Sequence, residues 1–383
     1  MTQSPPKRIA VAVQGGGAHG AFSWGVLDRL LESVGQRELV ITALSGTSAG
    51  GFNAALCAFA LGAGKDQASE AANAKRLLEE YWLADAAEAL FSPYSSTAKV
   101  WHDTLGTWNI DNAPVSLLAS VNNQVWSPAF FLQYDWLAAV LGNKIDFNAL
   151  QAQTNPPELY IATTNITEGR RDIFARTAVT LEVLKASASI PQVFLPPKYG
   201  ESYYWDGGFM GNPAITPLIT HATDVVIIQL NPFSRKEPPL TAMQINNRVN
   251  EITFNSSLVH EINAICAVNK MVDYFEALGK ENDIAKEAAK LLPVNKINLT
   301  RITNEPFLRT LGYASKAVIV KDFLIELRDQ GRDAADKWLN ECLPLLADTA
   351  PPHAGIPSQP TDKPREFPAD VIDKTLSRRH IIR

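Results

Sequence analysis

The 383-residue chain lacks several features that would assign it directly to a class of protein. Its three cysteines, Cys57, Cys266 and Cys342, stand far apart without metal-ligand spacing, which indicates small buried side chains in a reducing compartment. No stretch approaches the ~20 apolar residues that a membrane-spanning helix requires. The apolar run at residues 9–13 is too short for a signal peptide. We therefore expect a cytoplasmic protein whose contact with a membrane, where one occurs, is peripheral.

An excess of one charge is also missing. The chain carries 35 basic and 40 acidic residues, a formal net charge of −5, without long runs of either sign. Bulk charge therefore favours neither nucleic acid nor an anionic membrane as a partner. No coherent set of metal ligands is visible, so we expect neither a metal nor a cofactor. The oligomeric state is left open by the sequence.

The hydrophobic pattern predicts an α/β fold with parallel strands. Two strand–turn–helix units follow each other, with strands at residues 8–13 and 39–44 and helices at 21–33 and 52–61. Parallel strands joined by crossover helices are expected from such repeats. Further strands are expected at 158–163 and 224–230, with a helix near 181–189 between them.

The remainder of the chain divides by composition. A main domain at 8–232 contains an irregular, aromatic insertion at about 92–148, and a mainly helical extension at 233–346 shows apolar residues at helical spacing. A tail at 347–383 is rich in proline at its start. The insertion contains Trp101, Trp108, Trp126, Phe130, Phe131, Tyr134 and Trp136.

The second turn has the form of a nucleophile elbow. Gly46-Thr47-Ser48-Ala49-Gly50 matches G-x-S-x-G, in which small residues allow a sharp bend that places the serine at its apex. The alternative is a glycine-rich turn whose serine only caps the following helix. The position between an apolar strand and a helix favours Ser48 as a nucleophile.

The first turn allows two interpretations. Gly15, Gly17 and Gly20 satisfy the G-x-G-x-x-G pattern of a dinucleotide site. Such a site needs an acidic residue at the end of the second strand for the ribose, and this strand ends in residues 44–48, which contain none. Backbone amides at a helix N-terminus also suit the oxyanion of a tetrahedral intermediate, and we favour that interpretation.

A serine nucleophile needs a base, and the histidines do not supply an obvious one. None of the six lies in a motif that identifies it as a triad member: His19, His102, His221, His260, His353 and His380. Asp206 instead stands in Trp205-Asp206-Gly207-Gly208, where Gly207 and Gly208 allow a close backbone approach beside the carboxylate. An Asp-Gly-Gly turn on its own is commonly structural, and the two other glycine turns give it weight here.

Together these motifs make the chain resemble the bacterial patatin-like phospholipases. The resemblance is carried by residues 15–20, by 46–50, by 186–191 with 194–197, and by 206–208 followed by Asn212-Pro213. It implies a three-layer sandwich with a mainly parallel central sheet, of the patatin and cytosolic phospholipase A2 type, and a helical C-terminal extension. It further implies a Ser48–Asp206 dyad and an oxyanion loop of Gly15, Gly16, Gly17 and Ala18, with the last three amides as donors.

The resemblance also implies a lipid acyl hydrolase of the phospholipase A or lysophospholipase type. Ser48 forms an acyl-enzyme, Asp206 activates water, and burial of Asp206 is required to raise its basicity. The alternatives are an esterase or acyltransferase acting on a thioester, short-chain ester or storage polyester, and an inactive membrane-associated binding module. The aromatic insertion is expected to form either a lipid-facing lid or an ordinary part of the core.

One residue departs from the family pattern. His19 stands where most relatives carry Arg or Lys. Either a titratable charge replaces a permanent one near the oxyanion loop, or the positive charge at this position is dispensed with. His19 is therefore a candidate modulator of the reaction.

Overall fold

The computed structural model describes residues 5–64, 66–84, 92–114, 116, 141, 144–191, 193–279 and 296–346. The chain forms two compact units, residues 1–352 and 353–383, and all described residues belong to the first. The second unit, which forms most of the predicted tail at 347–383, lies outside the described residues.

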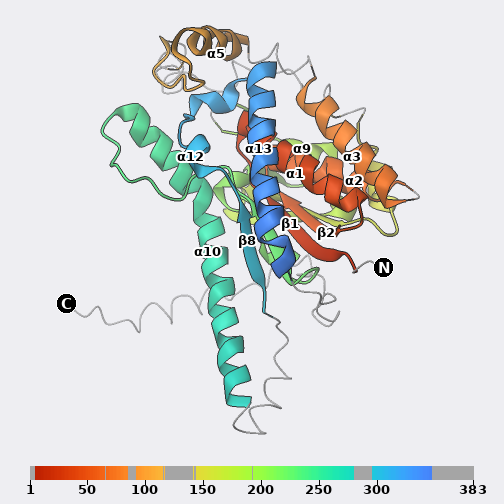
Figure 1. Ribbon diagram of the computed structural model, residues 1–383. Helices are drawn as coiled ribbons and strands as arrows, with labels where there is room; N and C mark the ends of the chain where they lie inside the picture. The colour runs from red at the N-terminus through yellow and green to blue at the C-terminus, as the bar shows by residue number, and fades with distance from the viewer. Residues whose placement is uncertain are drawn as a thin grey trace, which may run out of the picture. The chain divides into compact units, whose positions relative to one another are not determined.

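An eight-stranded sheet forms the centre of the first unit (Figure 1). Its strand order is β5-β6-β3-β2-β1-β7-β8, with β4 paired to β3. The neighbours from β3 to β8 along this order run parallel, and β4, β5 and β6 add antiparallel pairs at the other side. The strands are β1 (Lys7–Val13), β2 (Leu39–Gly46), β3 (Glu158–Asn165), β4 (Arg170–Ala175), β5 (Lys198–Tyr199), β6 (Ser202–Asp206), β7 (Asp224–Ile228) and β8 (Asn298–Ile302).

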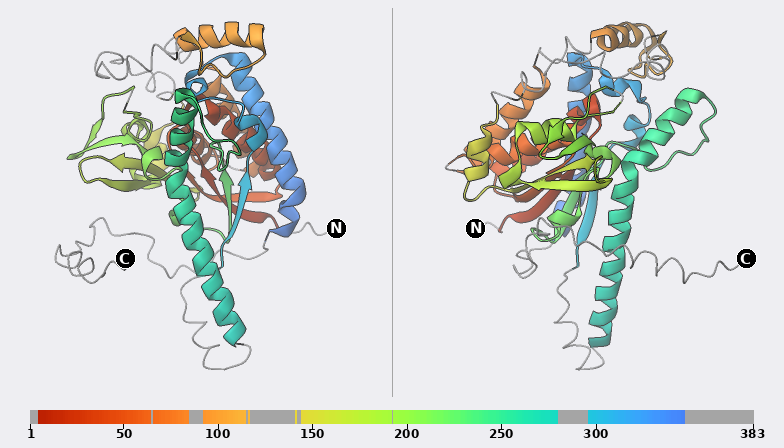
Figure 2. Two further views of the ribbon diagram at one scale, coloured as in Figure 1. Left: turned by 90° about the vertical axis from the view of Figure 1, so that its left-hand side faces the viewer. Right: turned by 180° about the vertical axis from the view of Figure 1, so that it is seen from behind.

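Both faces of the sheet are covered, as the continuous apolar sequence of β1 requires. Because side chains alternate along a strand, Ile9, Val11 and Val13 face one hydrophobic cluster and Ala10 and Ala12 face the other. The two helical layers lie on opposite sides of the strands (Figure 2). The first contains α1 (Gly20–Gly35), α2 (Ala49–Ala60), α3 (Gln67–Trp82) and α13 (Lys321–Glu341), and the second contains α10 (Ala242–Gly279) and the turn η5 (Thr216–Leu218). The expected α/β class is confirmed.

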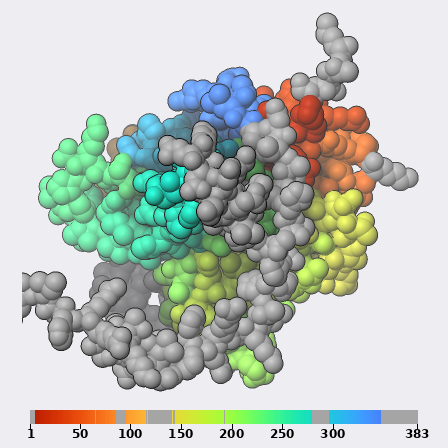
Figure 3. All heavy atoms as spheres, turned by 90° about the horizontal axis from the view of Figure 1, so that it is seen from below, coloured from red at the N-terminus to blue at the C-terminus, as the bar shows by residue number. Residues whose placement is uncertain are grey.

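The C-terminal region is built into this core. Helix α13 lies along α1, where Arg332 pairs with both Asp28 and Glu32. Seen from below, α13 in blue lies beside the red start of the chain, with α3 in orange next to it (Figure 3). Strand β8 pairs in parallel with β7, so residues 233–346 contribute to the sheet as well as to the helical layers.

Several elements differ from the sequence expectations. Strands β4, β5, β6 and β8 were not predicted, because they carry alternating polar residues and lie at or beyond the ends of the parallel array. The start of the insertion is helical, not irregular, as α5 spans Ser92–Leu105. The remaining short elements are α8 (Phe147–Ala152), α9 (Leu181–Ser187), α12 (Glu305–Leu308), η1 (Gly17–His19), η3 (Arg176–Ala178), η4 (Gly207–Phe209), η6 (Ala314–Ala317) and η7 (Leu343–Leu345).

Two tryptophans of the insertion belong to the core. Trp108 is buried, and its indole N–H donates to Glu326 Oε2 at 2.7 Å. Trp101 is half-buried against the same cluster. The other aromatic residues of the expected lid, Trp126, Phe130, Phe131, Tyr134 and Trp136, lie outside the described residues. Within the described helices, none has both the length and the apolar character needed to cross a bilayer.

Candidate active site

Ser48 lies at the junction of β2 and α2 in a strained backbone conformation. Its φ of 53° and ψ of −129° lie in a region that side chains other than glycine rarely adopt. The small residues around it permit this bend, since a Cβ at Gly50 would collide with Val13 O and one at Gly46 would collide with Gly50 O. Ala49 begins the helix. The structure therefore places Ser48 at the apex of a tight strand-to-helix turn, as the sequence predicted.

The elbow is held from two directions. The Ser48 N–H donates to Ser187 Oγ at 2.9 Å, and the Ser187 hydroxyl donates to Ala162 O at 2.7 Å, which links the elbow to α9 and β3. The Thr47 hydroxyl donates to Gly211 O at 2.5 Å. These contacts account for the serine-rich segment at 186–191, because its buried hydroxyl fixes the backbone of the nucleophile.

Asp206 ends β6 beside this elbow. Its N–H donates to Ser189 O at 2.8 Å, and its carbonyl accepts from the Thr164 hydroxyl at 2.8 Å. One carboxylate oxygen, Oδ1, accepts from the Gly208 N–H at 2.7 Å. Gly207 lies against Ala162 O, where a Cβ would collide. The Asp-Gly-Gly turn thus fixes both the backbone and one oxygen of Asp206.

The second carboxylate oxygen of Asp206 differs from the first in its contacts. Oδ2 is buried and has no hydrogen-bond partner within the described residues. Burial raises the pKa of Asp206 to about 6, and the Gly208 N–H, the Ser48 hydroxyl and the charge of Lys316 oppose this rise. The Ser48 hydroxyl therefore influences the carboxylate, although the two groups do not form a hydrogen bond of normal geometry.

The glycine loop lies against the nucleophile. A Cβ at Gly15 would be 2.9 Å from Ser48 Cβ. The Gly15 N–H donates to Asn212 Oδ1 at 2.6 Å, so this amide already has an acceptor. The amides of Gly16, Gly17 and Ala18 have no acceptor within the described part of the chain.

Gln14 connects the end of β1 to the segments at Asn212, Leu230 and Asn255, and sequence reasoning missed it. Its side chain is fully buried, and Oε1 accepts from the N–H groups of Leu230 and Asn231 at 2.7 and 2.8 Å. Its Nε2 donates to Asn255 Oδ1 at 2.8 Å and to Asn212 O at 3.2 Å. The only sequence signal was an amide side chain at the end of an apolar strand.

His19 does not supply the titratable charge considered from the sequence. Its Nε2 lies 2.8 Å from Ser315 Oγ, and the Ser315 hydroxyl donates to Gly312 O at 2.7 Å. Because that hydroxyl has one proton, His19 Nε2 must be the donor. Burial, and then the charge of Lys316, hold the pKa of His19 well below 6.5. His19 is therefore neutral at neutral pH, which excludes a titratable positive charge at this position.

The other described histidines make contacts away from Ser48. His102 stacks on Trp108, and His221 Nε2 hydrogen-bonds the Tyr160 hydroxyl at 2.8 Å. His260 is exposed on α10. His353 and His380 lie outside the described residues. Among the four described histidines, none hydrogen-bonds Ser48 or Asp206.

A half-buried lysine near the site was also missed. Lys316, in η6, donates from Nζ to Asn231 Oδ1 at 2.8 Å and to Asn250 Oδ1 at 2.6 Å. Burial lowers its pKa to about 8, and the charges of Glu251, Asp206 and Asp111 oppose this change. Sequence reasoning had no means of finding it, because Lys316 lies far along the chain from every motif.

Comparison with known proteins adds a family match. A family model described as patatin-like phospholipase matches residues 11–219, more than half of the chain. No curated protein matches the sequence. Among solved structures, VipD from Legionella pneumophila is similar with a TM-score of 0.37 and 15% identity, over 88% of this chain and 67% of VipD. Full-length SpcU in complex with full-length ExoU from the type III secretion system of Pseudomonas aeruginosa gives a TM-score of 0.25 and 19% identity, over 67% of this chain and 53% of that chain, about half its length.

Proposed function

This chain belongs to the patatin-like phospholipase family, a family of lipid acyl hydrolases, and on that premise we propose that it hydrolyses fatty acyl esters through an acyl-enzyme on Ser48. Asp206 acts as the base, and the amides of Gly16, Gly17 and Ala18 bind the oxyanion. The substrate class we propose is a phospholipid or lysophospholipid.

The observation that carries this proposal is the state of Asp206 Oδ2. A buried acceptor without a partner is costly, and it is tolerated here beside a serine hydroxyl on a strained elbow. Burial brings the pKa of Asp206 to about 6, so the carboxylate is ionised at neutral pH and more basic than an exposed aspartate. These observations support a nucleophile and a base that act without a histidine.

The proposed reaction has two halves. Ser48 Oγ attacks the ester carbonyl while its proton passes to Asp206 Oδ2, and the negative charge that develops on the carbonyl oxygen is bound by the free loop amides. The alkoxide of the lysolipid leaves with that proton. Asp206 then removes a proton from water, whose oxygen attacks the acyl carbon, and Ser48 recovers its proton as the fatty acid departs. Cytoplasmic location and peripheral contact with a lipid surface stay predictions.

A fluorophosphonate probe tests the nucleophile directly. The wild-type protein is expected to be labelled covalently and to release fatty acid from phospholipid vesicles, and Ser48→Ala is expected to lose both. Ser23→Ala is the matched control, because Ser23 is another fully buried serine at a helix, and its hydroxyl has no hydrogen-bond partner among the described residues. A folded wild-type protein that is not labelled, or a Ser48→Ala protein that is labelled normally, would contradict the proposal.

A further inference from the structure

The turn η6 presses its backbone against the oxyanion loop. A Cβ at Gly17 would collide with the carbonyl oxygen of Lys316, and the next residue back, Ser315, is hydrogen-bonded to His19. Gly17 has a φ of +58°, which glycine adopts at no steric cost. The backbone of Lys316 therefore contacts the glycine loop at Gly17, next to the amides that have no acceptor among the described residues.

The ammonium group of Lys316 extends from this turn to Asn231 and Asn250. Its Nζ lies 5.3 Å from the centre of the Phe254 ring, and that ring packs against Gly208, whose N–H holds the carboxylate. A small cavity lies beside the amine and is lined by His19, Asn231, Asn250, Glu251, Tyr313 and Lys316. The Phe254 ring thus links the cation to the Asp-Gly-Gly turn, and the backbone of the same lysine contacts the glycine loop.

A second set of contacts fixes the backbone of this segment. Asp111, which is buried, accepts from the Ala314 N–H at 2.9 Å and from the Asn247 side chain. Asn247 Oδ1 accepts in turn from the Tyr313 N–H at 2.6 Å. The backbone at the start of η6 is therefore fixed, and the position of the lysine does not depend on a flexible side chain alone.

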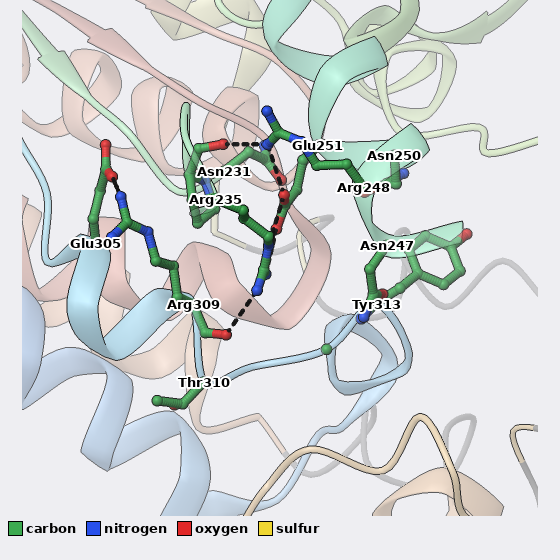
Figure 4. Close-up of polar contacts among 12 residues, drawn as sticks. Asn231, Arg235, Asn247, Arg248, Asn250, Glu251, Glu305, Arg309, Thr310 and Tyr313 are labelled. Atoms are coloured by element: carbon green, nitrogen blue, oxygen red, sulfur yellow. Dashed lines mark hydrogen bonds and ion pairs between the residues drawn. The ribbon is translucent and has the colours of Figure 1, made fainter. Parts of the chain in front are cut away.

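Glu251, the acidic side chain of α10 that lines this cavity, is already paired with two arginines. Arg235 and Arg248 converge on Glu251, with Arg235 Nη2 at 2.5 Å from Oε1 and Arg248 Nη1 at 3.0 Å from Oε2 (Figure 4). Asp111 binds neutral donors. The charged or titratable groups that act on Lys316 are Glu251, Asp206, Asp111 and His19, and none forms a direct ion pair with it within the described residues. Its charge is consequently available to Asp206.

We propose that Lys316 is a positioning residue for hydrolysis, and that its charge, supplied from a turn about a hundred residues beyond the family match, keeps Asp206 in the ionised form that accepts the Ser48 proton. The glycine loop itself carries no charge, since His19 is neutral. Lys316 replaces that missing charge from another part of the chain. This inference rests on the proposed function.

The acid limb of the pH–rate profile measures this effect separately from folding. Rates of fluorophosphonate labelling are determined from pH 5 to 8 for wild type, Lys316→Gln, Lys316→Met and Lys316→Arg. Both neutral variants are expected to move the midpoint of the acid limb to higher pH by about one unit. At a given pH well below the midpoint, the fraction of ionised Asp206 is then ~10-fold lower than in the wild type. Lys316→Arg is expected to keep the wild-type midpoint, even where its maximal rate is lower.

Lys321→Met is the matched control, because it removes the same charge from an exposed position five residues further on. Its midpoint should equal that of the wild type. Coincident midpoints for wild type and a folded neutral variant would overturn the inference, as would an equal displacement in Lys316→Arg. If Lys316→Met fails to fold, Lys316→Gln takes its place, because the glutamine amide preserves hydrogen bonding to Asn231 and Asn250. Absence of labelling in the wild type would overturn the proposed function instead.

Discussion

His19 Nε2 donates to Ser315 Oγ across 2.8 Å, and this bond joins the glycine-rich loop at residues 15–20 to the turn that carries Lys316. Both side chains are buried. The residue that departs from the family pattern is therefore a neutral structural contact, and the cation beside it comes from another part of the chain. Replacing His19 with arginine would not restore the usual charge but would add a second one next to Lys316.

We expect His19→Arg to lower both stability and hydrolysis at pH 8. The variant loses a buried hydrogen bond, which is worth about 1 to 3 kcal/mol, and it also places two like charges in a buried site. Ser315→Ala removes the same hydrogen bond without adding a charge, so its smaller loss provides the control. Urea unfolding and ester hydrolysis are the measurements. A His19→Arg protein as stable as Ser315→Ala and more active than the wild type would contradict this account.

Gly17→Ala is expected to damage the site more than its backbone conformation alone explains. Gly17 and Gly106 have similar φ values, +58° and +68°, but only the Cβ at Gly17 would meet another group, Lys316 O. Gly106→Ala should cost about 1 kcal/mol from left-handed strain. Gly17→Ala should cost more and reduce kcat at least ~10-fold, because the oxyanion loop or the Lys316 turn must move. Equal unfolding free energies and unchanged kcat in both variants would refute this expectation.

The raised pKa of Asp206 means that ionisation of this side chain lowers the stability of the native state. The native state holds the proton more tightly than the unfolded state, with a pKa of about 6 against 3.8, so this group makes stability fall as pH rises through that interval. Asp206→Asn cannot ionise and should be more stable than the wild type at pH 8, by ~3 kcal/mol at most. The difference should shrink below pH 4, as measured by urea unfolding at each pH.

Asp66 provides a control of opposite sign for that measurement. It caps α3 by accepting from the Ser69 N–H, and this hydrogen bond lowers its pKa. Its contribution to stability is present above the unfolded pKa and is lost as pH falls, so Asp66→Asn should be less stable than the wild type at pH 8. A difference between wild type and Asp206→Asn that does not change with pH would show that ionisation of Asp206 carries no cost.

Some parts of the candidate site are specified by residues that are consecutive in the chain. The elbow around Ser48 and the turn after Asp206 are each made by consecutive residues, so a single short motif contains the information that specifies them. The same holds for the first two strand–turn–helix units, whose apolar periods follow the strand and helix repeats closely. The weakly patterned strand β8 was missed for the converse reason, because an edge strand buries fewer side chains.

The sequence by itself therefore determined the family, the α/β class and the candidate dyad. Each of these depends on short motifs or periodic patterns, whose residues are neighbours in the chain. Only the tertiary structure decided the electrostatics: the burial of Asp206, the neutral state of His19 and the cation at Lys316. The physical reason is that a pKa depends on solvent exclusion and on charges nearby in space. Lys316 and Asp206 are far apart in sequence, and only the folded sheet with its packed C-terminal segment brings their charges within reach of each other.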